Sequence, residues 1–153
     1  MGKLVKYSKK LSVMDITLSY RKETIQFNLH DELAIHEDDI DRELRDQPRI
    51  YSFLSMLHKK LIKHVAEKEA IKERAYARGY MKARDTTDKT TGRFYAKEDA
   101  KYKAELDKLY IKTCNEYNEA KELLGIIETC VRGFEQRSYL LQTISANRRK
   151  ENG

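Results

Sequence analysis

Residues 102–144 read YKAELDKLYIKTCNEYNEAKELLGIIETCVRGFEQRSYLLQTI and place a mostly apolar side chain at every third or fourth position. Side chains at this spacing lie on one face of a helix, so the stretch predicts a long helix that turns one face to partner helices. The row comprises Tyr102, Leu106, Leu109, Thr113, Tyr117, Ala120, Leu124, Ile127, Val131, Phe134, Leu141 and Ile144.

The apolar set widens from Leu123 onward to more than one face of this helix. Such a helix needs several neighbours, and a chain of 153 residues is too short to supply them all. We therefore expect a homo-oligomer, in which other copies bury the second face. The residues expected at that interface are Leu123, Leu124, Ile126, Ile127, Val131, Phe134, Leu140, Leu141 and Ile144.

Composition limits the fold class. Charged residues make up 37% of the chain and apolar residues 40%, which indicates a thin core, as in a helical bundle or coiled coil. The chain has no apolar run of about 18 residues and no charged-then-apolar signal segment at its start, so we expect a soluble intracellular protein that does not enter a membrane. Its two cysteines are expected to be free thiols in a reducing compartment.

The charge is unevenly distributed. Residues 31–46 contain eight acidic residues against two arginines, whereas residues 59–103 contain fourteen basic residues against seven acidic ones. This polarity favours an anionic partner and head-to-tail self-association.

The chain divides into a basic N-terminal segment and a helical hairpin domain. In the first segment, apolar and polar residues alternate over 16–20 and 24–29, which predicts a small β-hairpin, although residues 25–35 also fit an amphipathic helical lead-in. Asp38 is expected to cap a short helix that ends before Pro48, because proline disfavours helical geometry in the residue before it. The sequence predicts a basic arm and possible β-hairpin at 1–36, followed by a helical hairpin domain at 37–153. Within this domain we expect a short helix at 38–46, a helix at 48–84, a loop at 85–93 and a helix at 96–149.

The apolar face of the second expected helix changes after Val65. Its continuation consists of Lys68, Lys72, Ala75 and Gly79, so the helix either leaves the core or lines a wet, positive groove. The two small residues would permit another backbone to approach closely. The last expected helix is long enough for a bend to be expected at residues 115–118, 125 or 133.

Basic and aromatic residues gather at the tip of this helical hairpin. Basic side chains neutralise phosphates and aromatic rings stack on unpaired bases, so this pattern is typical of a single-strand binding surface. The alternatives are a solvated helix face with ordinary ion pairs, and tyrosines that only pack, since Tyr76 and Tyr80 lie about 200° round the helix from Arg74 and Arg78. Expected contacts are Lys68, Lys72, Arg74, Tyr76, Arg78, Tyr80, Lys82, Arg84, Arg93 and Tyr95, with a second patch at Arg148 and Arg149.

The sequence gives no indication of catalysis. His58 and His64 are six residues apart and cannot share a metal ion from one helix, and the acidic run around His30 and His36 lacks the spacing of a calcium loop. Neither cysteine has a catalytic setting, and no phosphate-binding loop or dinucleotide fingerprint is present. We expect no enzyme activity, no metal and no cofactor.

The order of features from residue 38 to 150 resembles the UvsY-type recombination mediators of tailed phages. The resemblance rests on Ile50-Tyr51-Ser52, a basic helix from Lys72 to Tyr80, a polar loop, Phe94-Tyr95, and a terminal helix with Arg137-Ser138 and its leucines. It implies a ring or open barrel, built through the C-terminal helix, that binds single-stranded DNA and works in the host-cell cytoplasm. It also implies two partners, a recombinase and a single-strand-binding protein, and puts the family's DNA-contacting segment on Lys72, Arg74, Arg78 and Lys82.

The sequence thus predicts an all-α, homo-oligomeric protein with a small extended or β-hairpin N-terminal segment. The predicted function is that of a single-stranded DNA-binding recombination mediator, which helps load a recombinase in phage recombination or replication. The alternative is a structural or adaptor coiled-coil protein, such as a virion or assembly component, whose basic face binds an acidic protein surface.

Overall fold

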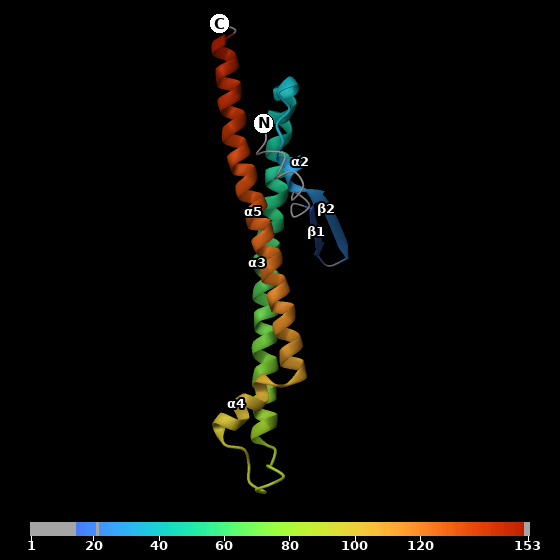
Figure 1. Ribbon diagram of the computed structural model, residues 1–153, viewed down its shortest axis with the longest axis vertical. Helices are drawn as coiled ribbons and strands as arrows, with labels where there is room; N and C mark the ends of the chain where they lie inside the picture. Colours follow the sequence, from blue (N-terminus) through green and yellow to red (C-terminus); the bar gives the residue numbers. More distant parts are fainter. Residues whose placement is uncertain (1–14, 21, 152–153) are drawn as a thin grey trace, which may run out of the picture. The chain divides into compact units, whose positions relative to one another are not determined.

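The computed structural model describes residues 15–20 and 22–151, which are mainly helical (Figure 1). Two long helices make up most of the chain, α3 (Ile40–Arg84) and α5 (Lys108–Glu151). The fold class predicted from the sequence, an all-α helical hairpin with a small N-terminal β-hairpin, is confirmed. The basic arm expected at the start of the segment 1–36 lies outside the described residues.

The chain forms two compact units, which cut across the division expected from the sequence. The first unit combines residues 1–57 with residues 126–153, and the second consists of residues 58–125. Each long helix therefore contributes one part to each unit. Among the described residues, no helix combines the length and apolarity needed to cross a membrane.

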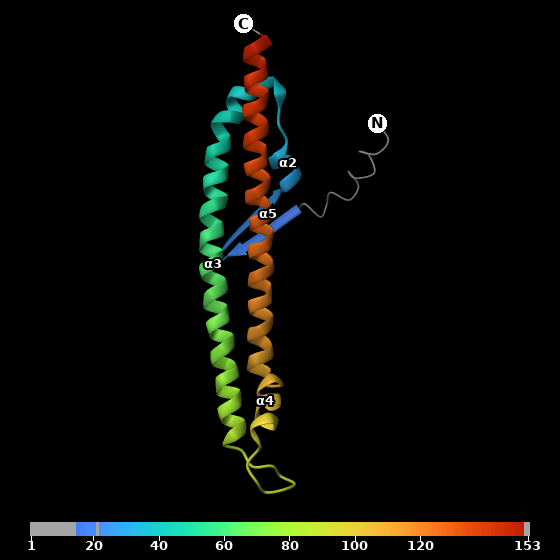
Figure 2. The same ribbon diagram turned by 90° about the vertical axis from the view of Figure 1, so that its left-hand side faces the viewer.

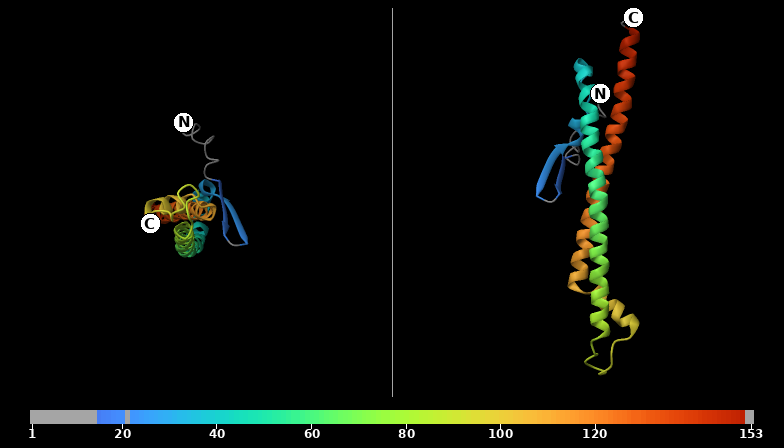
Figure 3. Two further views of the ribbon diagram at one scale, coloured as in Figure 1. Left: turned by 90° about the horizontal axis from the view of Figure 1, so that it is seen from below. Right: turned by 180° about the vertical axis from the view of Figure 1, so that it is seen from behind.

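The predicted β-hairpin is present in the first unit. Strands β1 (Asp15–Tyr20) and β2 (Glu23–Asn28) are antiparallel, with Ile16 opposite Phe27. Strand β2 runs directly into the short helix α2 (Leu29–Leu33), which Asn28 caps by accepting a 3.1 Å hydrogen bond from the Asp31 backbone N–H (Figure 3). The helical lead-in considered as an alternative is thus limited to the five residues of α2.

The helical break expected before Pro48 is absent, so that expectation is wrong. A short 3₁₀ turn, η2 (Glu37–Asp39), leads into α3. Asp39, and not Asp38, caps α3, because its carboxylate accepts a 3.3 Å hydrogen bond from the Arg42 N–H. Proline inside a helix removes one backbone hydrogen bond and costs about 3 kcal/mol. The neighbouring Gln47 is buried and bonded to α5, and these tertiary contacts hold the helix continuous.

The last expected helix is instead two helices, α4 (Lys97–Glu105) and α5. The chain turns at Leu106 and Asp107, and the Asp107 carboxylate caps α5 by accepting a 2.8 Å hydrogen bond from the Leu109 N–H. A bend was expected at residues 115–118, 125 or 133, and α5 continues as one helix through all of these positions. The turn also leaves the first part of the apolar row, Tyr102, Leu106 and Leu109, exposed.

The two units have different cores. Large side chains fill the first, where Leu54 and Leu57 of α3 and Ile127, Phe134 and Leu141 of α5 are all buried. Cys130 is a free, buried thiol of this core, and its burial raises its pKa to about 11. The core of the second unit contains small residues besides Leu61, namely Ala75, Ala83, Ala100, Ala104 and Ala120.

Candidate nucleic-acid interface

In the second unit, the last part of α3 runs beside the first part of α5, with α4 following the tip loop (Figure 2). The close approach expected at Gly79 is confirmed, since a Cβ at this position would lie 3.3 Å from the Cα of Ala104. Ala75 and Ala83 continue the same buried line on α3. These small residues let α3 and α4 pack backbone to backbone.

Lys68 and Lys72 stay on the packed face of α3 and find partners on α5. The Lys68 ammonium donates a 2.6 Å hydrogen bond to the Glu116 carboxylate, and this bond holds the pKa of Glu116 below its ordinary value. The Lys72 ammonium lies 4.2 Å from the centre of the Tyr117 ring, in a cation–π contact. The prediction that α3 leaves the core at Lys68 and Lys72 is therefore wrong. Both ammonium groups are engaged within the chain.

The tyrosines of α3 are half-buried. Tyr76 makes an edge contact with Tyr110 of α5, with ring centres 5.4 Å apart, and Tyr80 is also half-buried. Tyr76 thus takes the packing role considered as the alternative to base stacking.

Three basic side chains of α3 form an exposed row, Arg74, Arg78 and Lys82, which we call the basic row. Their spacing of four residues puts them on one flank of the helix, about a quarter-turn from the buried line. In the part of the chain that the structure describes, none of their side chains forms an ion pair. Exposed Ile71 and Met81 lie on the same flank, at 43% and 65% exposure, so the basic row is bordered by apolar surface.

The loop between α3 and α4 is a hydrogen-bonded turn. The Asp88 N–H donates to the Arg93 carbonyl and the Gly92 N–H to the Asp88 carbonyl, both at 2.8 Å, and Gly92 takes the left-handed φ of 63° that such a turn requires. Arg93 and Phe94 are exposed beyond it. The Arg84 guanidinium is engaged within the chain, because it donates a 2.8 Å hydrogen bond to the Tyr95 carbonyl. The Tyr95 ring packs under the Lys103 ammonium at 4.2 Å.

The second predicted patch lies in an acidic neighbourhood of the first unit. Arg148 and Arg149 line a hollow of about 570 Å³ together with Asp38, Asp39 and Asp41. The Arg149 guanidinium also donates to the Ser145 hydroxyl at 3.2 Å. Nearby carboxylates lower the local positive potential, so this patch is less suited to phosphate than the basic row.

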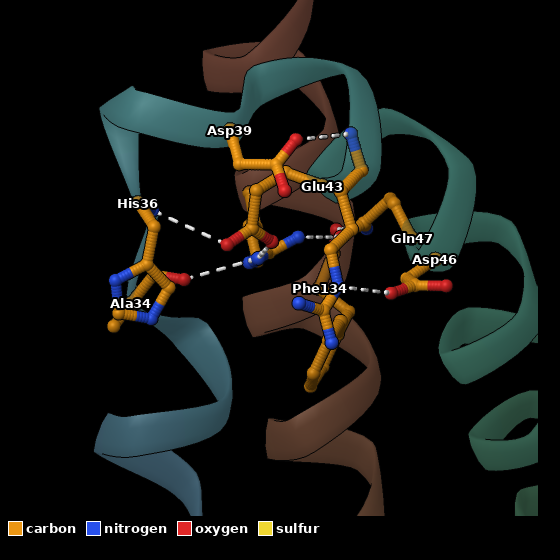
Figure 4. Close-up of polar contacts among 9 residues, drawn as sticks. Ala34, His36, Asp39, Glu43, Asp46, Gln47 and Phe134 are labelled. Carbon is orange, nitrogen blue, oxygen red and sulfur yellow. Dashed lines mark hydrogen bonds and ion pairs between the residues drawn. The ribbon is translucent and has the colours of Figure 1, made fainter.

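The first unit contains a buried charged cluster that was not predicted from the sequence (Figure 4). Arg137 is only 5% exposed, and its guanidinium donates to the Gln47 side-chain oxygen at 2.6 Å, to the Ala34 carbonyl at 3.0 Å and to the Glu43 carboxylate. The Gln47 amide in turn donates to the Phe134 carbonyl at 2.6 Å. The sequence did contain a signal, because Arg137 continues the buried line of α5 between Phe134 and Leu141.

This cluster perturbs the titration of Glu43. Partial burial acts to raise the pKa of Glu43, but the hydrogen bonds from Arg137 and the His36 N–H and the positive charge of Arg137 outweigh burial, so the pKa lies below its ordinary value. The carboxylate therefore stays charged and paired near neutral pH. Arg137, which the family resemblance includes, is a structural residue of this unit.

The residues expected at the oligomer interface fall into two groups. Ile127, Phe134 and Leu141 are buried within the chain's own first unit and leave no surface for a second copy. Leu140 is 57% exposed. The others are partly exposed, and they are Leu123, Leu124, Ile126, Val131 and Ile144.

Comparison with known proteins shows what fold this is. Crystal structures of the recombination mediator protein UvsY of bacteriophage T4 match the chain with TM-scores of 0.67 and 0.66 in lattice types IV and I, and 0.64 in lattice type II. The identity is 20% for lattice type IV, where the match covers 80% of this chain and 92% of UvsY, and 19% for the other two. The match covers 82% of this chain and 93% of UvsY in lattice type II, and 80% and 95% in lattice type I. No protein family model matches the sequence, and neither does any curated protein.

Proposed function

We propose that this protein is a single-stranded DNA-binding recombination mediator, which helps load a recombinase onto strands covered by single-strand-binding protein. It acts as a homo-oligomer in the cytoplasm of a phage-infected cell, without a catalytic step or a cofactor. The observation that carries the proposal is the basic row, which is exposed and, among residues 15–20 and 22–151, forms no ion pair, on a fold shared with a phage recombination mediator. The exposed apolar surface of Ile71 and Met81 beside it can pack against the faces of unpaired bases, which duplex DNA keeps stacked.

The charge of the second unit supports an anionic ligand. Seventeen lysines and arginines outnumber twelve acidic residues between residues 58 and 125, a balance of +5. Lys68 and Lys72 are engaged within the helical hairpin, whereas Arg74, Arg78, Lys82 and Arg93 are among its exposed positive side chains near the tip. A surface of this kind neutralises several backbone phosphates, and its affinity falls steeply with salt.

The decisive experiment compares labelled oligothymidine with a duplex by fluorescence anisotropy over a series of salt concentrations. We expect tighter binding of the single strand, and a weaker salt dependence for the double variant Arg74→Glu/Arg78→Glu, with a slope smaller by about one for each lost phosphate contact. The matched control is Lys59→Glu/Lys108→Glu, which reverses two exposed charges of the same unit outside the basic row. Equal losses in the two variants, or no binding of oligothymidine by the native protein, would contradict the proposal.

A loading assay tests the second half of the proposal. A mediator shortens the lag before a recombinase displaces single-strand-binding protein, so the native protein should shorten this lag and the Arg74→Glu/Arg78→Glu variant should not. The alternative role, a coiled-coil adaptor for an acidic protein, is favoured by the buried positions of α5 that recur every seven residues, Thr113, Ala120, Ile127, Phe134 and Leu141. An adaptor would bind neither DNA form in the anisotropy experiment.

A further inference from the structure

A groove of about 620 Å³ lies in the second unit, beside the turn that joins α3 to α4. Its walls come from the end of α3, the turn, and the junction of α4 with α5. This volume lies within the usual range for a site that binds a small molecule. The lining residues are Gly79, Lys82, Ala83, Thr86, Thr87, Asp88, Lys89, Thr90, Tyr95, Lys103, Leu106 and Asp107.

Three lysines line this groove, Lys82, Lys89 and Lys103. Lys103 is held by its contact with the Tyr95 ring, 4.2 Å from the ring centre. In the described part of the chain, neither Lys82 nor Lys89 forms an ion pair. The groove thus presents cations from three separate segments of the second unit.

The two acidic residues of the groove are occupied by backbone groups. Asp88 accepts a 2.6 Å hydrogen bond from the Thr90 N–H, and this bond is the main reason why the pKa of Asp88 lies below its ordinary value. Asp107 accepts from the Leu109 N–H at 2.8 Å and from the Tyr110 N–H at 3.4 Å. These hydrogen bonds hold both carboxylates at the backbone, and with three lysines against two aspartates the lining of the groove keeps a net charge of +1.

We propose that this groove binds a phosphate group of a nucleotide, and that it holds one backbone phosphate of the single strand. Ammonium groups form charge-assisted hydrogen bonds to phosphate oxygens, and the Thr87 hydroxyl adds a neutral donor. Lys82 belongs to both the basic row and the groove, so a strand that follows the row over about 12 Å of helix reaches the groove. This inference rests on the proposed function.

The test records amide chemical shifts of the ¹⁵N-labelled full chain during titration with thymidine 5′-monophosphate, inorganic phosphate and thymidine. We expect both phosphate probes to shift the amides of residues 86–93 and thymidine to leave them unchanged. The variant Lys89→Gln/Lys103→Gln should bind thymidine monophosphate about tenfold more weakly, because two charge-assisted hydrogen bonds are lost. The matched control Lys59→Gln should bind as the native protein does, and Lys89→Glu, a single change in an exposed loop, should weaken binding without disturbing the helices.

This experiment separates the two proposals. If the native protein binds oligothymidine but neither phosphate probe shifts these amides, the groove proposal is overturned and the proposed function stands. If the Arg74→Glu/Arg78→Glu variant no longer binds oligothymidine but still binds thymidine monophosphate, the groove proposal is supported, and the groove is a site separate from the rest of the basic row. Equal shifts with thymidine alone would show that the groove does not recognise phosphate, and binding of neither ligand would overturn both proposals.

Discussion

The two units use charge in opposite ways. In the described part of the first unit, thirteen acidic residues outnumber nine basic ones, and the most buried arginine, Arg137, is neutralised by Glu43 inside the protein. In the second unit the basic residues are in excess, and Arg74, Arg78 and Lys82 are exposed and form no ion pair with any residue that the structure describes. The difference shows that charge content alone does not identify a binding surface, because the same residue types serve stability in one unit and remain available to a ligand in the other.

The largest expected effect comes from removing the buried cation of the first unit. Arg137→Met removes the cation that pairs with the Glu43 carboxylate and the donor to the Gln47 side-chain oxygen, and breaking a buried ion pair from one side costs about 3–5 kcal/mol. Urea denaturation followed by circular dichroism measures this loss. A cost below about 1 kcal/mol would mean that the cluster is not what holds the first unit.

The next effect tests the close packing of the second unit. Gly79→Leu forces a side chain against the Ala104 backbone, and overpacking of this kind costs about 1–3 kcal/mol. Gly125→Ala is the matched control, because a Cβ at that helical position meets no described atom within 4 Å, and it should stabilise the protein by about 0.5–1 kcal/mol. Equal effects of the two changes would contradict the close approach at Gly79.

A smaller effect concerns pH. The pKa of Glu43 is lower in the folded protein than its ordinary value of 4.5, so its ion pair stabilises the fold above that value, and this contribution is lost as the pH falls through the folded pKa. Glu43→Gln should therefore reduce the loss of stability between neutral and acidic pH, as measured by urea denaturation at several pH values. Glu119→Gln, at an exposed position of the second unit, is the control and should leave the pH profile unchanged.

The smallest expected effect on stability is that of Arg78→Ala. This exposed side chain forms no ion pair in the described chain, so its loss should change the free energy of unfolding by no more than about 0.5 kcal/mol. The same variant should still weaken oligothymidine binding. A stability loss comparable to that of Arg137→Met would show that the two arginines do not differ in role.

Periodicity predicted the helices well because it reflects burial along a single element. The alternation of apolar and polar residues over 16–29 predicted the β-hairpin, and the glycine at position 79 predicted the close approach of two backbones. These features depend on local spacing, which a sequence displays directly.

The features that were not predicted depend on contacts between distant segments. Pro48 remains inside α3 because Gln47 is anchored to α5, and the chain turns at Asp107 because a carboxylate caps the following helix. Lys68 and Lys72 resemble binding residues in sequence, and only their neighbours Glu116 and Tyr117, more than 40 residues away, show that they are engaged. Local propensity is overridden wherever such tertiary contacts are strong.

The contact between Gly79 and Ala104 also fixes the distance between two helices that each carry a lysine of the groove, Lys82 and Lys103. The width of the groove is therefore controlled by two small residues, Gly79 in its wall and Ala104 behind it, and not by its lysines. In related chains, substitution of these two small residues could make the groove wider or narrower while all three of its lysines stay at the same sequence positions.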